Sequence, residues 1–89
     1  MIARRVSITG KVQGVFFRKT TQEEARALGV IGWVRNCDDG SVEAHLEGEQ
    51  DAVDALIDRL RSGPPNAKVD ALDARAVEPE GHDGFAVRH

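Results

Sequence analysis

The sequence has 89 residues, of which 40% are hydrophobic. A chain of this length can bury only one modest core, and we therefore expect a single domain over residues 1–89. One cysteine excludes an internal disulfide framework, and the absence of a signal-peptide pattern or a run near the ~20 apolar residues of a membrane span indicates a cytoplasmic protein without a membrane partner. The net charge of −3 argues against nucleic-acid binding by phosphate neutralisation, but residues 1–40 carry seven basic and four acidic side chains and can form a local site for a small anion.

The first part of the chain predicts a strand, a helix and a second strand. Hydrophobic and polar side chains alternate in residues 4–12, as in a strand with one buried face. Residues 20–28 contain two overlapping Thr-x-x-Glu capping boxes and precede Gly29, a suitable helix end. One face of this helix carries small or hydrophobic side chains, namely Phe17, Thr21, Ala25 and Leu28. Residues 30–36 are rich in β-branched and aromatic residues and predict a second strand.

The second part predicts a hairpin, a helix and a further strand. Residues 37–40 end in Asp-Gly, which is typical of a tight hairpin turn, and residues 41–48 alternate as a third strand. Residues 49–63 predict the best amphipathic helix of the chain, with a hydrophobic stripe formed by Val53, Leu56, Ile57 and Leu60. Residues 69–77 predict a fourth strand, and its alternation changes near residue 71, which indicates a bulge or an edge position.

The order strand, helix, strand, strand, helix, strand predicts an α+β fold of the ferredoxin-like type. In this arrangement one antiparallel sheet carries both helices on one face. Residues 85–88 are long enough to add a short fifth strand at the C-terminus. Because the first and third strands each have a polar face, we expect the other face of the sheet to be exposed to solvent.

Residues 11–18, KVQGVFFR, connect the first strand to the first helix and contain the elements of a phosphate site. Gly14 permits a tight bend that directs successive backbone N–H groups into one concavity, at a helix N-terminus whose dipole favours an anion. Arg18, in the loop or in the first helical turn, offers a planar guanidinium that can contact two phosphate oxygens. The segment matches neither the Walker A nor the GxGxxG pattern. The residues alone leave two interpretations open, a phosphate site or an ordinary turn with a surface arginine.

The wider sequence resembles the acylphosphatase family. The loop pattern V-x-G-V-x-F-R of that family is filled by Val12, Gly14, Val15, Phe17 and Arg18. Residues 32–36, GWVRN, and residues 39–43, DGSVE, match further motifs, and the similarity continues to residue 88. The resemblance covers nearly the whole chain. It implies the ferredoxin-like fold and the hydrolysis of small acyl phosphates to a carboxylate and inorganic phosphate, with neither a metal nor any other cofactor.

The resemblance also implies roles for individual residues. The phosphate would be held by the loop amides and by the arginine, in the segment formed by Gln13, Gly14, Val15, Phe16, Phe17 and Arg18. Asn36 would position the attacking water, although on its own an asparagine here is typical of a turn entry. A carboxylate with a pKa near ~4 leaves without a general acid, so the chemistry needs mainly positioning and charge stabilisation. We expect the product phosphate to inhibit competitively and the protein to be a monomer.

Other conspicuous residues are predicted to be structural. His45 is expected on the solvent-exposed face of the third strand and His82 in a loop, and no pair has metal-ligand spacing, so no metal site is predicted. Trp33 is expected in the core. Cys37 lies beside the turn with no histidine near it in sequence, so we do not expect a nucleophile.

The two adjacent phenylalanines are expected to differ. One of Phe16 and Phe17 should pack under the helix, while the other lines the mouth of the site. Lys11 and Lys19 are basic residues near the loop that either raise its local potential or are simply solvated charges.

Two other kinds of function are compatible with a ferredoxin-like fold. RNA-recognition domains stack bases on aromatic side chains of the central strands, but residues 6–9, VSIT, and residues 42–47, VEAHLE, supply no aromatic side chain and two repelling glutamates. We therefore expect no nucleic-acid partner. A domain that only binds a phosphorylated ligand is the other alternative, and an assay of acyl-phosphate turnover distinguishes it from an enzyme.

Overall fold

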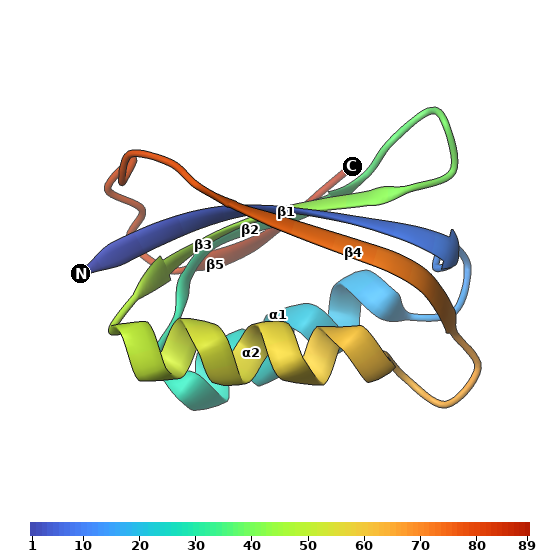
Figure 1. The fold of residues 1–89 in the computed structure, drawn as a ribbon, viewed down its shortest axis with the longest axis horizontal. Coiled ribbons are helices and arrows are strands. Elements are labelled where there is room, and N and C mark those ends of the chain that lie inside the picture. The colour runs from blue at the N-terminus through green and yellow to red at the C-terminus, as the bar shows by residue number, and fades with distance from the viewer.

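The computed structural model describes residues 1–89 and consists of a five-stranded sheet with two helices packed on one face (Figure 1). In chain order the elements are β1 (Ile2–Lys11), α1 (Phe17–Leu28), β2 (Ile31–Asn36), β3 (Val42–Gly48), α2 (Gln50–Ser62), β4 (Lys68–Ala76) and β5 (Phe85–Arg88). This order confirms the predicted ferredoxin-like arrangement and the short fifth strand. Neither helix is long and apolar enough to span a bilayer.

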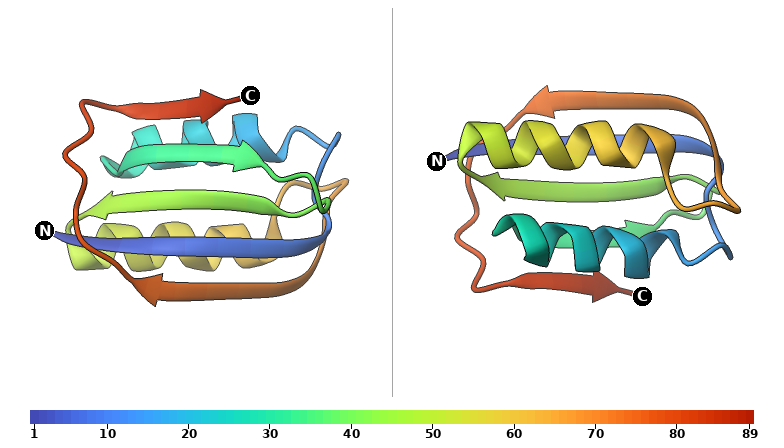
Figure 2. Two further views of the ribbon diagram at one scale, coloured as in Figure 1. Left: turned by 90° about the horizontal axis from the view of Figure 1, so that it is seen from above. Right: turned by 90° about the horizontal axis from the view of Figure 1, so that it is seen from below.

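The strands lie in the order β4-β1-β3-β2-β5. The four strands predicted from the alternating pattern pair antiparallel, but β5 pairs parallel with β2, with Gly32 opposite Phe85. The sheet is therefore mixed, because the fifth strand, whose direction the sequence did not predict, runs parallel to its neighbour. Figure 2 shows the reason, since the chain crosses from β4 at one edge to the opposite edge and then runs in the direction of β2.

The irregularity predicted near residue 71 is an edge strand that also contains a bulge. Strand β4 forms one edge of the sheet. Thr9 lies opposite Ala71, and Gly10 lies opposite Val69, so Asp70 is an extra residue on β4. An added residue of this kind shifts the side chains after it to the other face. Both predicted features are confirmed.

The hydrophobic core fills the space between the sheet and the helices. The predicted stripe of α2 is buried in full, with Val53, Leu56, Ile57 and Leu60 exposed by 8% or less. Helix α1 contributes Phe17 and Ala25 to the same core. Each large side chain buried here stabilises the fold by roughly 1.5–3 kcal/mol.

Helix α1 begins four residues earlier than its first capping box suggests, since its N-cap is Phe16 instead of Thr20. No side chain caps it, and the capping residue is Phe16 in a left-handed conformation with φ of 62° and ψ of 22°. Thr21 lies inside the helix, where its hydroxyl donates to the Phe17 carbonyl oxygen at 2.8 Å. The end at Gly29, with φ of 73°, is as predicted.

The face of the sheet opposite the helices is only partly open to solvent, which corrects two predictions. His45 and Glu47 of β3 are fully buried, because the segment between β4 and β5 folds over them. Trp33 is also buried, but it lies on this outer face, with the guanidinium groups of Arg5 and Arg88 at 4.9 and 4.5 Å from the ring centroid. Trp33 is therefore buried, but outside the cluster of hydrophobic residues between the sheet and the helices.

Two carboxylates of this outer face, those of Glu47 and Glu80, have lowered pKa values. Burial raises the pKa of Glu47, but the hydrogen bonds it accepts from the Glu80 N–H, from His45 and from the Gly81 N–H outweigh burial and lower it. Hydrogen bonds from His82 and from Trp33 lower the pKa of Glu80 to about 2.

Candidate active site

The loop between β1 and α1 contains two residues with a left-handed backbone. Gly14 has φ of 72°, and a Cβ added to it would meet no atom within 4 Å, so the backbone angle and not a lack of space favours glycine. Phe16 has φ of 62° although it carries a side chain, which costs roughly 1–2 kcal/mol. Strain of this kind persists only where surrounding structure enforces it, and it is concentrated at functional sites.

The two phenylalanines differ as predicted. Phe17 is only 2% exposed and packs in the core, whereas Phe16 is 75% exposed. The ring of Phe16 lines an open groove of about 370 Å³ beside the loop. The residues around this groove are Gly14, Phe16, Arg18, Lys19, Gln22, Val87 and His89.

The start of α1 directs unpaired backbone donors toward the loop. The N–H of Thr20 donates to the Phe16 carbonyl oxygen at 2.9 Å and is the first to make a helical hydrogen bond. The N–H groups of Phe17, Arg18 and Lys19 consequently have no partner within the helix. They lie at the positive end of the helix dipole, where an anion is favoured.

Arg18 lies in the first turn of α1, which decides between the two locations left open by the sequence. Its Nη1 donates to the Arg88 carbonyl oxygen at 2.9 Å and to His89 Nδ1 at 3.1 Å. The end of β5 lies beside the start of α1 (Figure 2), so the guanidinium reaches the C-terminal edge of the sheet. An anionic ligand can replace both acceptors, because a guanidinium binds an anion more strongly than a carbonyl oxygen or an imidazole nitrogen.

Asn36 is the last residue of β2 and carries the clearest unsatisfied group of the chain. Its Oδ1 atom is buried and has no hydrogen-bond partner. Because side chains alternate along a strand, Asn36 lies on the helix side together with the buried Val34. Arg35, the residue before Asn36, lies opposite Arg88 of β5. The carbonyl oxygen of Arg88 accepts a hydrogen bond from Arg18, so Asn36 lies near the residue that Arg18 contacts.

Gln13 joins the loop to the hairpin that follows Asn36. Its Nε2 donates to the carbonyl oxygens of Cys37 and Ser41, both at 2.8 Å. Asp39 stabilises the same turn, since its Oδ1 accepts from the Ser41 hydroxyl at 2.6 Å and from the Ser41 N–H at 3.0 Å. These hydrogen bonds lower the pKa of Asp39, and the one from the Ser41 hydroxyl has the larger effect. The turn that follows Asn36 is thus fixed relative to the loop.

The structure places Gln13, Arg18 and Asn36 at one end of the sheet, but of these three only Arg18 lines the groove. Val15 and Phe17 also belong to the predicted loop, but their side chains are buried, so only their backbone is available to a ligand. Several groove residues had not been predicted, namely Gln22, Val87 and His89. No pattern indicates Val87 and His89, because their place depends on the parallel pairing of β5. Gln22 lies on α1 and its Nε2 donates to the Phe85 carbonyl oxygen at 3.0 Å.

The fold and the site together define a small ferredoxin-like domain with a basic groove at its strand–helix loop. A family model described as acylphosphatase matches residues 4–87. The chain is 52% identical over 83 residues to the acylphosphatase of Haloquadratum walsbyi, covering 93% of this chain and 89% of that relative. It is 48% identical over 88 residues to the acylphosphatase of Anaeromyxobacter dehalogenans, covering 98% and 95%. The crystal structure of acylphosphatase from Bacillus subtilis has a TM-score of 0.97 and 36% identity, with both chains covered completely.

The chain therefore belongs to the acylphosphatase family. The resemblance recognised in the sequence and the prediction of an acylphosphatase enzyme are confirmed. Family and fold together support the hydrolysis of acyl phosphates. Both the loop at residues 12–18 and Asn36 lie within the matched region.

Proposed function

We propose that this chain hydrolyses small acyl phosphates in the groove beside residues 13–18, with Arg18 and the loop amides holding the phosphate. The observation that carries this proposal is the position of Arg18 in the first turn of α1, where the backbone N–H groups have no helical partner. A phosphate bound there would replace the Arg88 carbonyl and His89 as partners of the guanidinium. Charge-assisted hydrogen bonds to phosphate are about twice as strong as neutral ones, which favours this exchange.

Asn36 positions the attacking water in this proposal. Its buried Oδ1 can accept a hydrogen bond from the water, which then lies at the end of the sheet that Arg18 reaches. The water oxygen forms the new bond to phosphorus while the bond from phosphorus to the acyl oxygen breaks. The bonding electrons leave with the carboxylate, and the water proton passes to a phosphate oxygen. No general acid is required, because a carboxylate is already stable at neutral pH.

Neither a metal nor a second chain takes part in this scheme. The negative charge of the transition state is met by Arg18 and by the amides, so we expect EDTA to leave activity unchanged. Residues 1–89 act as one domain, and a monomer suffices, because the loop, Arg18 and Asn36 come from the same chain. The exposed ring of Phe16 is available to contact the acyl group, which has no dedicated pocket. We therefore expect several small acyl phosphates to be substrates.

Steady-state kinetics with benzoyl phosphate tests the role of Arg18. Arg18→Ala should weaken phosphate inhibition about 10- to 150-fold, as expected for a lost charged hydrogen bond. It should also lower kcat on the order of 10³-fold, as for other arginines that stabilise a transferred phosphoryl group. Arg18→Lys should recover little activity, because an ammonium cannot contact two oxygens in one plane.

Arg26→Ala is the matched control, because this exposed arginine lies two turns later on the same helix. It should leave both kcat and phosphate inhibition unchanged. Normal turnover by Arg18→Ala would remove the basis of the proposal. Tight phosphate binding by the native chain without any turnover would instead identify a domain that only binds phosphorylated ligands.

A further inference from the structure

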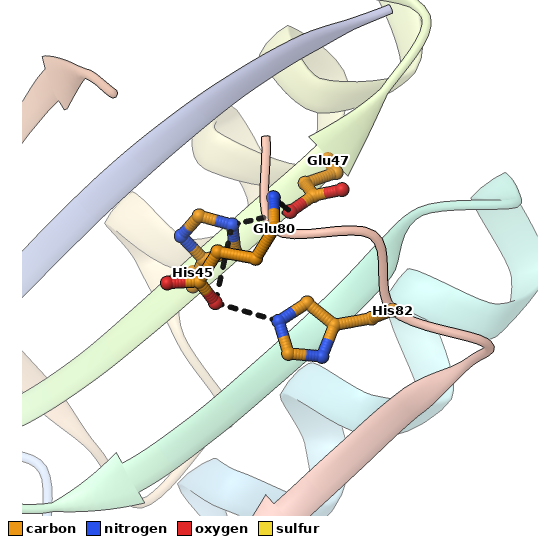
Figure 3. A group of neighbouring side chains, drawn as sticks. All are labelled: His45, Glu47, Glu80 and His82. Carbon is orange, nitrogen blue, oxygen red and sulfur yellow. Dashed lines mark hydrogen bonds and ion pairs between the residues drawn. The ribbon is translucent and has the colours of Figure 1, made fainter. Parts of the chain in front are cut away.

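A second cluster of ionisable side chains lies on the outer face of the sheet, away from the groove. His45 and Glu47 come from β3, and Glu80 and His82 come from the segment that joins β4 to β5 (Figure 3). One nitrogen or oxygen atom of each residue lies within 4.8 Å of all the others. The two pairs are 33 or more residues apart along the chain, so no metal-ligand spacing is visible in the sequence.

The distances in the cluster fit a small tetrahedral ion. His45 Nε2 lies 2.6 Å from Glu47 Oε2 and 3.7 Å from Glu80 Oε1, and His82 Nε2 lies 2.6 Å from Glu80 Oε1. Ligand atoms at ~2.0–2.1 Å from zinc in a tetrahedron are separated by about 3.3 Å. The observed separations lie on both sides of this value, so movements of the order of 1 Å would complete the coordination.

We propose that His45, Glu47, Glu80 and His82 form a binding site for a divalent cation of the zinc type. Imidazole nitrogen favours zinc and its neighbours over magnesium or calcium, and the two carboxylates balance the charge of the ion. Four protein ligands leave no open coordination position, which is the arrangement of a structural site. The sequence predicted no metal site, and the proposal departs from that prediction because the fold brings together residues that are distant along the chain.

The groups around the cluster hold its ligands in place. Glu47 accepts hydrogen bonds from the backbone N–H groups of Glu80 and Gly81. Glu80 accepts from Trp33 Nε1 at 3.2 Å and from the Arg5 guanidinium at 3.0 Å. Such outer contacts orient the ligands and maintain the site.

Arg5 must adjust when an ion binds. It now donates to His45 Nδ1 over long distances of 3.3 and 3.4 Å, so the ring proton is on Nε2, which faces Glu47. When an ion binds Nε2, the ring takes its other tautomer, with the proton on Nδ1, and the contact with Arg5 is lost. The shorter contact of Arg5 with Glu80 remains.

The ion would link residues 77–84, the segment between β4 and β5, to strand β3 without contacting the groove. Glu47 lies opposite Ala3, near the start of β1, whereas the loop of the groove follows the end of β1. We therefore expect zinc to raise Tm and to leave kcat unchanged. This result is independent of the proposed function, since the stability measurement needs no substrate.

Calorimetric titration of the EDTA-treated chain with Zn²⁺, together with thermal melts, tests the proposal. We expect one ion per chain and an increase in Tm. His82→Gln and Glu80→Gln should each weaken binding by more than about 100-fold, because residues that merely orient metal ligands already contribute 10- to 100-fold. Asp83→Asn is the matched control, since this exposed acid adjoins His82 and should bind zinc as the native chain does.

Circular dichroism of both ligand variants confirms that they fold, which is expected because Glu80 and His82 lie outside the helices and strands. Zinc binding that survives in both variants would overturn the site. So would the absence of any binding at micromolar zinc, or binding with no change in Tm.

Discussion

Asn36 allows catalysis and stability to be separated by one substitution. A buried polar atom without a partner costs roughly 1–3 kcal/mol, and Asn36 Oδ1 is the only such side-chain atom in the structure. Asn36→Ala removes this atom together with a short side chain at a strand end. Taking the low end of the range, we expect the free energy of unfolding to rise by about 1 kcal/mol, which corresponds to an increase of about 4–8 °C in Tm for a domain of this size.

The same substitution should severely reduce turnover. Loss of one positioned hydrogen-bonding group typically lowers kcat on the order of 10²- to 10³-fold. Inhibition by phosphate should stay within about twofold of the native value, because the amide contacts the water and not the phosphate. This combination is typical of an interaction made only in the transition state.

Steady-state kinetics, phosphate inhibition and thermal melts on one preparation provide the comparison. Asn66→Ala is the control, because the second asparagine of the chain is exposed and lies outside the helices and strands. It should change neither kcat nor Tm. If Asn36→Ala lowers Tm while kcat stays near normal, the asparagine is a structural turn residue and the water-positioning role is wrong.

Three further substitutions test the local structure. Phe16→Gly should relieve the left-handed strain and hold or raise Tm, while KM for benzoyl phosphate rises; a marked fall in Tm would show that the exposed ring supports the fold. Gly32→Ala should lower the free energy of unfolding by more than about 3 kcal/mol, because a Cβ there would lie 1.8 Å from the His45 carbonyl oxygen; a denaturant midpoint near that of the native chain would contradict this. Ser41→Ala should raise the pKa of Asp39 toward its ordinary value, as followed by NMR. The native chain gains stability at neutral pH from the lowered pKa and loses it as the pH falls through that pKa, so the substitution should reduce this gain. An unchanged Asp39 titration would exclude the hydroxyl as the cause.

The helices and the antiparallel strands could be predicted from the sequence, because each has its own hydrophobic period. The stripe of α2 and the alternation of β1 directly reflect burial on one face. The segment between β4 and β5 has no such period, and it is fixed over the sheet by hydrogen bonds to Glu47. His45 and Glu47 therefore appeared to face solvent, although the fold buries both.

The sequence predicted the parts of the candidate site that depend on side-chain type, but not the parts that depend on main-chain groups. Gly14 and Arg18 were identified by their chemistry, and Asn36 by its resemblance to a motif. The partner of Arg18 in the structure is the carbonyl oxygen of Arg88, which is the same for every residue type and leaves no trace in a sequence. The double contact of Gln13 is equally hidden, since it depends on the shape of the hairpin turn.

Unfavourable features are concentrated at the loop end of the sheet. The left-handed Phe16 costs roughly 1–2 kcal/mol and the unpaired Oδ1 of Asn36 roughly 1–3 kcal/mol, which together form a large part of the 5–15 kcal/mol that holds a domain of this kind folded. Glycine in place of Phe16 and an apolar residue in place of Asn36 would remove both costs. At the other end, by contrast, the buried carboxylate of Glu47 accepts hydrogen bonds from His45 and from two backbone N–H groups. Stability alone therefore gives no reason for Phe16 or Asn36, which is the pattern expected where a residue is retained for function.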